Sequence, residues 1–395
     1  MEPLHGRIRD YAWGSRTVLA ELQGRPTPTE GPEAELWLGA HPGDPSTLLR
    51  GDAPVSLVEA FAADPEHWLG ADVLDRFGQR LPYLLKVLAP EAPLSLQAHP
   101  DAEQARAGYA AETTDPELTH RNYVDPYHKP EMLVAVSPFQ ALCGFRDPAR
   151  SAELLEAFGV PALAPVVTAL RGGLDGLRDA VRTLLSWPAD ERAGLVAAVV
   201  AAEVPPGYAP AADLARDLAV RYPADPGVLV ALLLNHVHLE PGEAIWMPAG
   251  NLHAYLFGAG VEILASSDNV LRGGLTPKHV DVPELLRVLR FEVLADPVVK
   301  PVPVVPGVVT WPVPVDDFAL HGVRLDDTVG SASVEVRGPR IVLCLAGAVT
   351  VADAAGSVLL GPGQSAIGPA DGGPVTLSGA GEAYVASVGS LPLPD

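Results

Sequence analysis

The stretch Pro241–Tyr255, which reads PGEAIWMPAGNLHAY, decides the fold that this chain is expected to adopt. Turn signals at Pro241-Gly242 and Pro248-Ala249-Gly250 predict a strand, a tight turn and a second strand. Side chains alternate between the faces of a strand, so His253 and Tyr255 share one face. A lone histidine is more often structural than functional, but the turn fixes the direction of this one. We therefore treat His253 as a candidate metal ligand.

The spacing G-x5-P-x-G-x2-H within this stretch resembles the second sequence motif of the cupin barrels. The match is partial, because Phe257 stands where many cupins carry Asn. The glycine and proline recur as Gly363-x5-Pro369, where no histidine follows at the corresponding place. We expect a cupin-type jelly-roll catalytic barrel and a second, jelly-roll-like β domain without a metal.

Upstream, the stretch Pro93–Pro100 reads PLSLQAHP and predicts another strand. Alternation places Ser95, Gln97 and His99 on one face and apolar side chains on the other. An amide oxygen and an imidazole two residues apart are close enough to bind one ion. The alternative is a half-exposed strand whose polar face meets water.

The stretch Tyr127–Val136, YHKPEMLVAV, begins an otherwise apolar strand with Glu131. A buried carboxylate without a partner is costly, so Glu131 is expected to be solvated or bound to a cation. That cation is either a metal ion or simply the neighbouring Lys129.

A fourth stretch, Val261–Lys278, carries Glu262 on a strand that leads into a polar loop with two glycines. The loop presents Arg272 and Lys278, which suit an oxyanion, although an ordinary exposed loop would also carry such charges. Only four of the 27 basic residues of the chain are lysines, and Lys129 and Lys278 both fall in these stretches.

Between Pro148 and Asn235, helical periodicity replaces the strand-like pattern of the flanking sequence. One apolar stripe has i, i+3, i+4, i+7 spacing and consists of Leu177, Ala180, Val181, Leu184 and Leu185. The Pro- and Val-rich segment Asp296–Pro314 predicts an extended linker. The expected fold is mainly β with a helical insert: a discontinuous catalytic barrel over residues 1–147 and 236–300, an inserted helical domain over 148–235, and a C-terminal β domain over 301–395.

Charge and composition narrow the possible partners. The formal net charge is −22, which argues against nucleic acid and anionic membrane surfaces. Only Cys143 and Cys344 are present, so we expect no disulfide framework and a cytoplasmic protein. No apolar run is long enough to span a bilayer. The expected partner is a small molecule, and the expected state is a monomer or weak oligomer.

Taken together, the motifs resemble type I mannose-6-phosphate isomerases. The similar stretches occur in the family's order and are Tyr11–Ser15, Glu35–Gly39, Leu94–Asp101, His128–Val136, Pro248–Tyr255 and Ser267–Lys278. The resemblance implies one zinc ion per chain, held by Gln97, His99, Glu131 and His253. It also implies that Arg272 is the essential arginine of the family.

The implied reaction interconverts mannose 6-phosphate and fructose 6-phosphate through a cis-enediol. Glu262, Lys129 and His128 are candidates for proton transfer, with preference for the first two. Further expected roles are a hydroxyl contact for Tyr255, phosphate binding for Ser95 and Lys278, and cavity lining for Trp13, Glu35 and His128. The alternatives are another metal-dependent cupin sugar enzyme and a non-catalytic sugar-phosphate-binding cupin.

Overall fold

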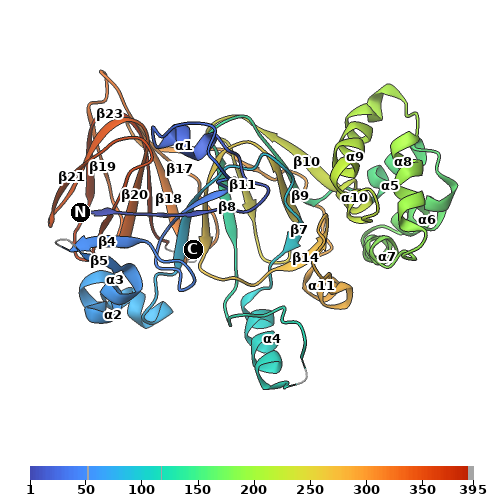
Figure 1. Cartoon of the computed structure of the whole chain (residues 1–395), viewed down its shortest axis with the longest axis horizontal. Helices are drawn as coiled ribbons and strands as arrows, with labels where there is room; N and C mark the ends of the chain where they lie inside the picture. The colour runs from blue at the N-terminus through green and yellow to red at the C-terminus, as the bar shows by residue number, and fades with distance from the viewer. Residues whose placement is uncertain (51–52, 117, 390–395) are drawn as a thin grey trace, which may run out of the picture.

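Two antiparallel β-sheets stacked face to face make up the middle of the molecule, which a computed structural model describes for residues 1–50, 53–116 and 118–389 (Figure 1). The seven-stranded sheet has the order β15-β11-β8-β13-β6-β3-β2. Its strands are β2 (Arg7–Arg9), β3 (Glu35–Leu38), β6 (Tyr83–Leu88), β8 (Glu131–Ala135), β11 (Ala244–Met247), β13 (Gly260–Ala265) and β15 (Val298–Val299). The five-stranded sheet has the order β10-β9-β12-β7-β14. Its strands are β7 (Leu96–Ala98), β9 (Phe139–Phe145), β10 (Leu234–Leu239), β12 (His253–Phe257) and β14 (Leu271–Gly274).

An apolar cluster that includes Leu133, Ala141 and Met247 packs between the two sheets. Alternation along the strands then decides which other side chains enter this space. In the seven-stranded sheet, Leu85, Val87, Val261 and Ile263 pack on the outer face. Lys86 and Glu262 stand between these residues in sequence and therefore point inward. Glu35 and Glu131 point the same way, because their neighbours Leu36 and Met132 pack on the outer face.

Helices cover the outer face of the five-stranded sheet at one end of the molecule (Figure 1). They are α5 (Pro148–Ala157), α6 (Ala164–Leu170), α7 (Leu174–Leu185), α8 (Arg192–Ala201), α9 (Ala209–Arg221) and α10 (Gly227–Ala231). The predicted apolar stripe is confirmed, because all five of its residues are buried on α7. Leu96, Ala98 and Ala254 from the sheet join the same core, so their sequence neighbours Gln97 and His253 face the other sheet.

The remaining helices lie elsewhere around the sheets. They are α1 (Val18–Leu22), α2 (Leu57–Ala63), α3 (Pro65–Phe77), α4 (Ala102–Thr114) and α11 (Val282–Val288). A separate hairpin consists of β4 (Thr47–Arg50) and β5 (Ala53–Ser56). Within the described ranges, no helix combines the length and the apolarity needed to cross a membrane.

A nine-stranded sheet forms the opposite end of the molecule (Figure 1). Its strands are β1 (Glu2–Leu4), β16 (Val302–Val305), β17 (Val308–Thr310), β18 (Ala319–Leu325), β19 (Ser331–Val334), β20 (Arg337–Asp353), β21 (Gly356–Leu360), β22 (Ser365–Gly368) and β23 (Val375–Val388). One core containing Met132, Val134, Phe318 and Ile341 joins it to the outer face of the seven-stranded sheet. Strand β1 comes from the start of the chain, yet it pairs with β22 in this sheet.

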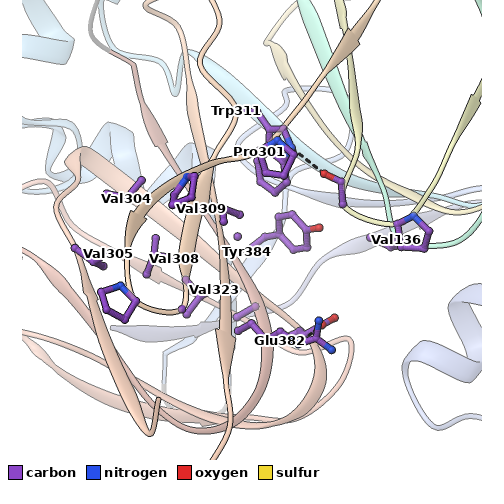
Figure 2. Close-up of a pocket in the computed structure, with 18 of the residues that line it drawn as sticks. Val136, Pro301, Val304, Val305, Val308, Val309, Trp311, Val323, Glu382 and Tyr384 are labelled. Carbon is purple, nitrogen blue, oxygen red and sulfur yellow. Dashed lines mark hydrogen bonds and ion pairs between the residues drawn. The ribbon is translucent and has the colours of Figure 1, made fainter. Parts of the chain in front are cut away.

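The prediction of a linker over Asp296–Pro314 is wrong in part, because this segment contributes β15, β16 and β17. Strands β15 and β16 each lie at the edge of a sheet, where proline is tolerated since one side of the strand needs no ladder hydrogen bonds. The hairpin β16–β17 borders a groove between the nine-stranded sheet and the edge of the seven-stranded sheet, where Val136 and Gly242 line it (Figure 2). Trp311 closes one side of the groove by donating from Nε1 to the carbonyl oxygen of Gly242, 3.0 Å away.

Candidate metal centre and active-site cavity

Three side chains from three strand segments converge between the stacked sheets. Glu131 begins β8, His253 begins β12, and His99 directly follows β7. The Oε2 atom of Glu131 lies 3.3 Å from Nε2 of His99 and 3.1 Å from Nε2 of His253. All three side chains are buried, and their ligand atoms all lie within 4.8 Å of one another.

The backbone fixes the direction of both imidazoles. Nδ1 of His99 lies 2.7 Å from the carbonyl oxygen of Asn269, and Nδ1 of His253 lies 3.1 Å from that of Asn251. A carbonyl can only accept, so each ring carries its proton on Nδ1 and turns the lone pair of Nε2 toward Glu131. Burial lowers the pKa of His99 to about 4, which keeps this ring neutral near pH 7.

These three atoms pass a simple test for a cation. Nε2 of His99, Nε2 of His253 and Oε2 of Glu131 are buried and have no hydrogen-bond partner among the residues that the structure describes. Buried polar atoms are rarely left unpaired, and two imidazole nitrogens with a carboxylate oxygen form a donor set that suits zinc and similar divalent ions. The residues present therefore fit a metal ion.

Gln97 lies beside this cluster. It pairs directly with His253 across β7 and β12, and with Arg272 across β7 and β14. Side chains of directly opposed residues share one face of a sheet, so Gln97, His253 and Arg272 all point into the space between the sheets. The amide of Gln97 is thus able to act as a fourth ligand from the same side as His99.

A cavity of about 540 Å³ opens beside the cluster. Ten of the residues singled out from the sequence line it: Trp13, Glu35, Ser95, Gln97, Lys129, Glu131, Tyr255, Glu262, Arg272 and Lys278. His99 and His253 are almost fully buried behind this surface. His128 is not among the lining residues; its Nε2 lies 2.9 Å from Oδ2 of Asp317, in the nine-stranded end of the molecule.

Deep in the cavity, the charged side chains form ion pairs with one another. Lys86 lies 3.2 Å from Glu262 and 3.6 Å from Glu35, while Lys129 lies 3.0 Å from Oε1 of Glu131. Burial alone would lower the pKa of Lys86, but the carboxylates of Glu35 and Glu262 outweigh it and raise that pKa. Lys86 therefore stays charged in its buried position.

Glu262 occupies a different electrostatic environment from Glu131. Burial raises the pKa of Glu262, and the nearby charge of Glu131 raises it further, while Lys86 and the hydroxyl of Tyr255 oppose the change. That hydroxyl donates to Oε1 of Glu262 over 2.6 Å. Burial would also raise the pKa of Glu131, but the imidazole of His99 and the ammonium group of Lys129 beside it lower that pKa well below its ordinary value. The pKa values of these two neighbouring carboxyl groups are thus shifted in opposite directions.

Lys86 is the residue of this cluster that the sequence analysis missed. It interrupts the apolar run Tyr83–Leu88 and is one of only four lysines in the chain. A single charge inside a fully buried strand was the available signal, because such a charge requires a partner.

A second cavity, in the groove of Figure 2, is larger at about 740 Å³. Valine and proline from the hairpin β16–β17 dominate its wall, and Arg324 and Glu382 are its ionisable residues besides Tyr384. It contains none of the candidate ligands. Chemistry rather than volume therefore identifies the smaller cavity as the candidate active site.

Comparison with known proteins gives a consistent result. The family model described as phosphomannose isomerase type I, catalytic domain, matches residues 1–148. The mannose-6-phosphate isomerase of Salmonella typhimurium is 37% identical over 388 residues, covering 96% of this chain and 98% of the relative. That of Escherichia coli is also 37% identical, over 389 residues, with the same coverage, and that of Bos taurus is 32% identical and covers 88% of each chain.

The fold agrees with these similarities. Crystal structures of two point mutants of phosphomannose isomerase from Salmonella typhimurium superpose with a TM-score of 0.88 at 34% identity. Each alignment covers 99% of this chain and 100% of the other.

Proposed function

This chain belongs to the type I phosphomannose isomerase family, and we propose that it interconverts mannose 6-phosphate and fructose 6-phosphate in the cavity beside His99, Glu131 and His253. One observation carries the assignment of the site. Three buried ligand atoms, none with a hydrogen-bond partner in the described part of the chain, converge at the wall of a polar cavity that also holds paired carboxylates and lysines. An aldose-ketose isomerase needs a charge-stabilising centre and a proton-transfer group side by side.

We assign one zinc ion to this centre, with Gln97, His99, Glu131 and His253 as its ligands. The donor set of nitrogen and oxygen atoms supports zinc, as does the fixed direction of both imidazoles. Bound there, zinc would act as a Lewis acid toward substrate oxygens that gain negative charge.

Glu262 is the proposed proton-transfer group. A base for this reaction must be able to accept a proton near neutral pH, and burial shifts the pKa of Glu262 in that direction. The hydroxyl of Tyr255 holds one carboxylate oxygen, while Lys86 pairs with the other. Lys129 is a weaker candidate because its ammonium group is already paired with Glu131.

The other cavity residues receive binding roles. Arg272 lies opposite Gln97 on the neighbouring strand, which supports a role in neutralising an enediolate. Ser95 and Lys278 would hold the phosphate, and Trp13 and Glu35 would contact the sugar. His128 is left without a substrate role, since it contacts Asp317 instead.

The same proposal covers the finer points of architecture. We assign the stacked five- and seven-stranded sheets to a cupin-type barrel, with residues 148–235 as a helical insert and residues 301–395 as a second β domain. A cytoplasmic location, and a monomer or weak oligomer, remain predictions; both cysteines are free and buried.

A coupled assay of mannose 6-phosphate conversion tests the function. The zinc-loaded chain should turn over, and Arg272→Ala should reduce kcat/KM about 100-fold, because a charge aimed at the developing oxyanion is lost. Absence of turnover in the zinc-loaded wild type would reject the proposal. Equal activity of Arg272→Ala would remove that residue from the mechanism.

A further inference from the structure

Five cationic side chains line the active-site cavity, and they fall into two groups. Lys86 and Lys129, deep in the cavity, are paired with carboxylates. Arg221, Arg272 and Lys278 have no ion pair with any residue that the structure describes, although all three line the cavity. In a chain of net charge −22, unpaired cations gathered around one cavity need an explanation.

Arg221 comes from a different part of the chain than the other two. It is the last residue of α9, within the helical segment between β9 and β10, and its side chain is exposed. Arg272 lies on β14, and Lys278 lies in the loop that follows. The helices thus contribute a charged residue to a cavity whose other walls are built by the sheets.

Close contacts hold this end of α9 against the cavity. The hydroxyl of Tyr222 donates to the carbonyl oxygen of Pro93 over 3.4 Å, just before the strand that carries Gln97. Oδ2 of Asp225 accepts from the backbone N–H of Thr276 over 3.0 Å, in the loop that carries Lys278. The segment from Arg221 to Asp225 is therefore tied to both the ligand strand and the cation loop.

The backbones also meet directly at this boundary. Gly274 adopts φ +116°, and a Cβ atom placed there would lie 2.6 Å from Cα of Gly227. Glycine is thus required for α10 and the end of β14 to approach this closely. The relative positions of Arg221, Arg272 and Lys278 are consequently set by packing rather than by a flexible loop.

We propose that Arg221 binds the phosphate group of the sugar phosphate, together with Lys278, at the mouth of the cavity. This inference rests on the proposed function. A phosphate monoester carries close to two negative charges at pH 7. The depth of the cavity already holds Glu35, Glu131 and Glu262, which would repel such a group. The unpaired cations are its natural partners, and arginine offers a fork of N–H donors that matches phosphate oxygens.

Steady-state kinetics with mannose 6-phosphate test this assignment in the zinc-loaded enzyme. Arg221→Ala should raise KM about tenfold with little change in kcat, because the phosphate contact is made equally in the ground and transition states. Inorganic phosphate, used as a competitive inhibitor, should bind the variant more weakly by a similar factor. Arg221→Lys keeps the charge and should restore part of the affinity.

Arg182→Ala is the matched control, since Arg182 is an exposed arginine on α7 of the same helical segment. It should keep the wild-type KM and phosphate inhibition. Wild-type values in Arg221→Ala for both quantities would overturn the inference, as would a fall in kcat at unchanged KM. If the proposed function is wrong, the wild type itself will show no turnover. In that case calorimetric titration with inorganic phosphate still tests Arg221, because Arg221→Ala should bind phosphate more weakly than the wild type.

Discussion

Nε2 of His253 and Oε2 of Glu131 lie 3.1 Å apart, and with a neutral ring neither buried atom forms a hydrogen bond within the described ranges of the chain. Two lone pairs that face each other at this distance repel unless a cation lies between them. The same carboxylate oxygen also faces Nε2 of His99 at 3.3 Å. A metal ion bound between these atoms would stabilise this arrangement.

Glu131→Gln should abolish stoichiometric zinc binding, because the amide supplies no negative charge to the ion. Elemental analysis of the purified chain after dialysis against zinc measures this directly. Glu203→Gln is the control, since Glu203 is exposed and lies far along the chain in the helical segment. Full zinc content in Glu131→Gln would remove Glu131 from the ligand set.

Glu262→Gln should lower kcat about 100-fold or more while zinc content stays near that of the wild type, because a proton-transfer group is lost and the ligands are intact. The amide still accepts a hydrogen bond from Tyr255. The measurement is kcat in the coupled assay, with zinc analysed on the same sample. A kcat within about twofold of the wild type would assign proton transfer elsewhere, with Lys129 the next residue to test.

The pH dependence of kcat/KM reports the charge around Glu262. If Glu262 acts as the base, activity should fall as the pH decreases through its pKa, which burial raises above the ordinary 4.5. Lys86 opposes that shift, so Lys86→Met should raise the pKa of Glu262 further and move the acid limb of the profile to higher pH. An acid limb that stays in place would contradict the Lys86–Glu262 coupling.

Asn269 is buried and holds the backbone that orients His99. Its side chain accepts from the backbone N–H of Val124 over 2.8 Å and donates to the carbonyl oxygens of Asp125 and Tyr127. Its own carbonyl oxygen accepts from Nδ1 of His99. Asn269→Ala should therefore weaken zinc binding about tenfold to 100-fold in a chelator competition.

Asn122→Ala provides the comparison, because Asn122 loses a side-chain hydrogen bond to Asp281 outside the centre. It should keep the zinc affinity of the wild type. Equal affinities in the two variants would show that the Asn269 backbone needs no side-chain support.

Strand alternation made it possible to predict which side chains of Pro93–Pro100 face the site. Pro93–Pro100 alternates polar and apolar residues, and the structure turns Leu96 and Ala98 to the helices and Gln97 to the opposite sheet. Glu131 was expected to be either solvated or bound to a cation, and the structure buries it: Lys129 pairs with Oε1, while Oε2 has no hydrogen-bond partner among the described residues. The metal ion stays a prediction.

Long-range pairing explains what the sequence could not provide. Lys86 forms ion pairs with Glu35 and Glu262, which lie on strands far away in sequence. In the sequence, Arg221 is one of several arginines in the helical segment. In the structure, the contact between Asp225 and Thr276 holds this end of the helix at the cavity. His128 precedes the motif residue Lys129 in sequence, but its side chain contacts Asp317 at the nine-stranded end of the molecule. Local periodicity contains no information about these partners.

The most direct test of the metal centre is to measure zinc content and mannose 6-phosphate isomerase activity on one preparation, before chelation, after chelation and after reloading with zinc. We predict one zinc per chain and activity that is lost with the metal and regained with it. Activity that persists in chain shown to be free of metal would contradict the account.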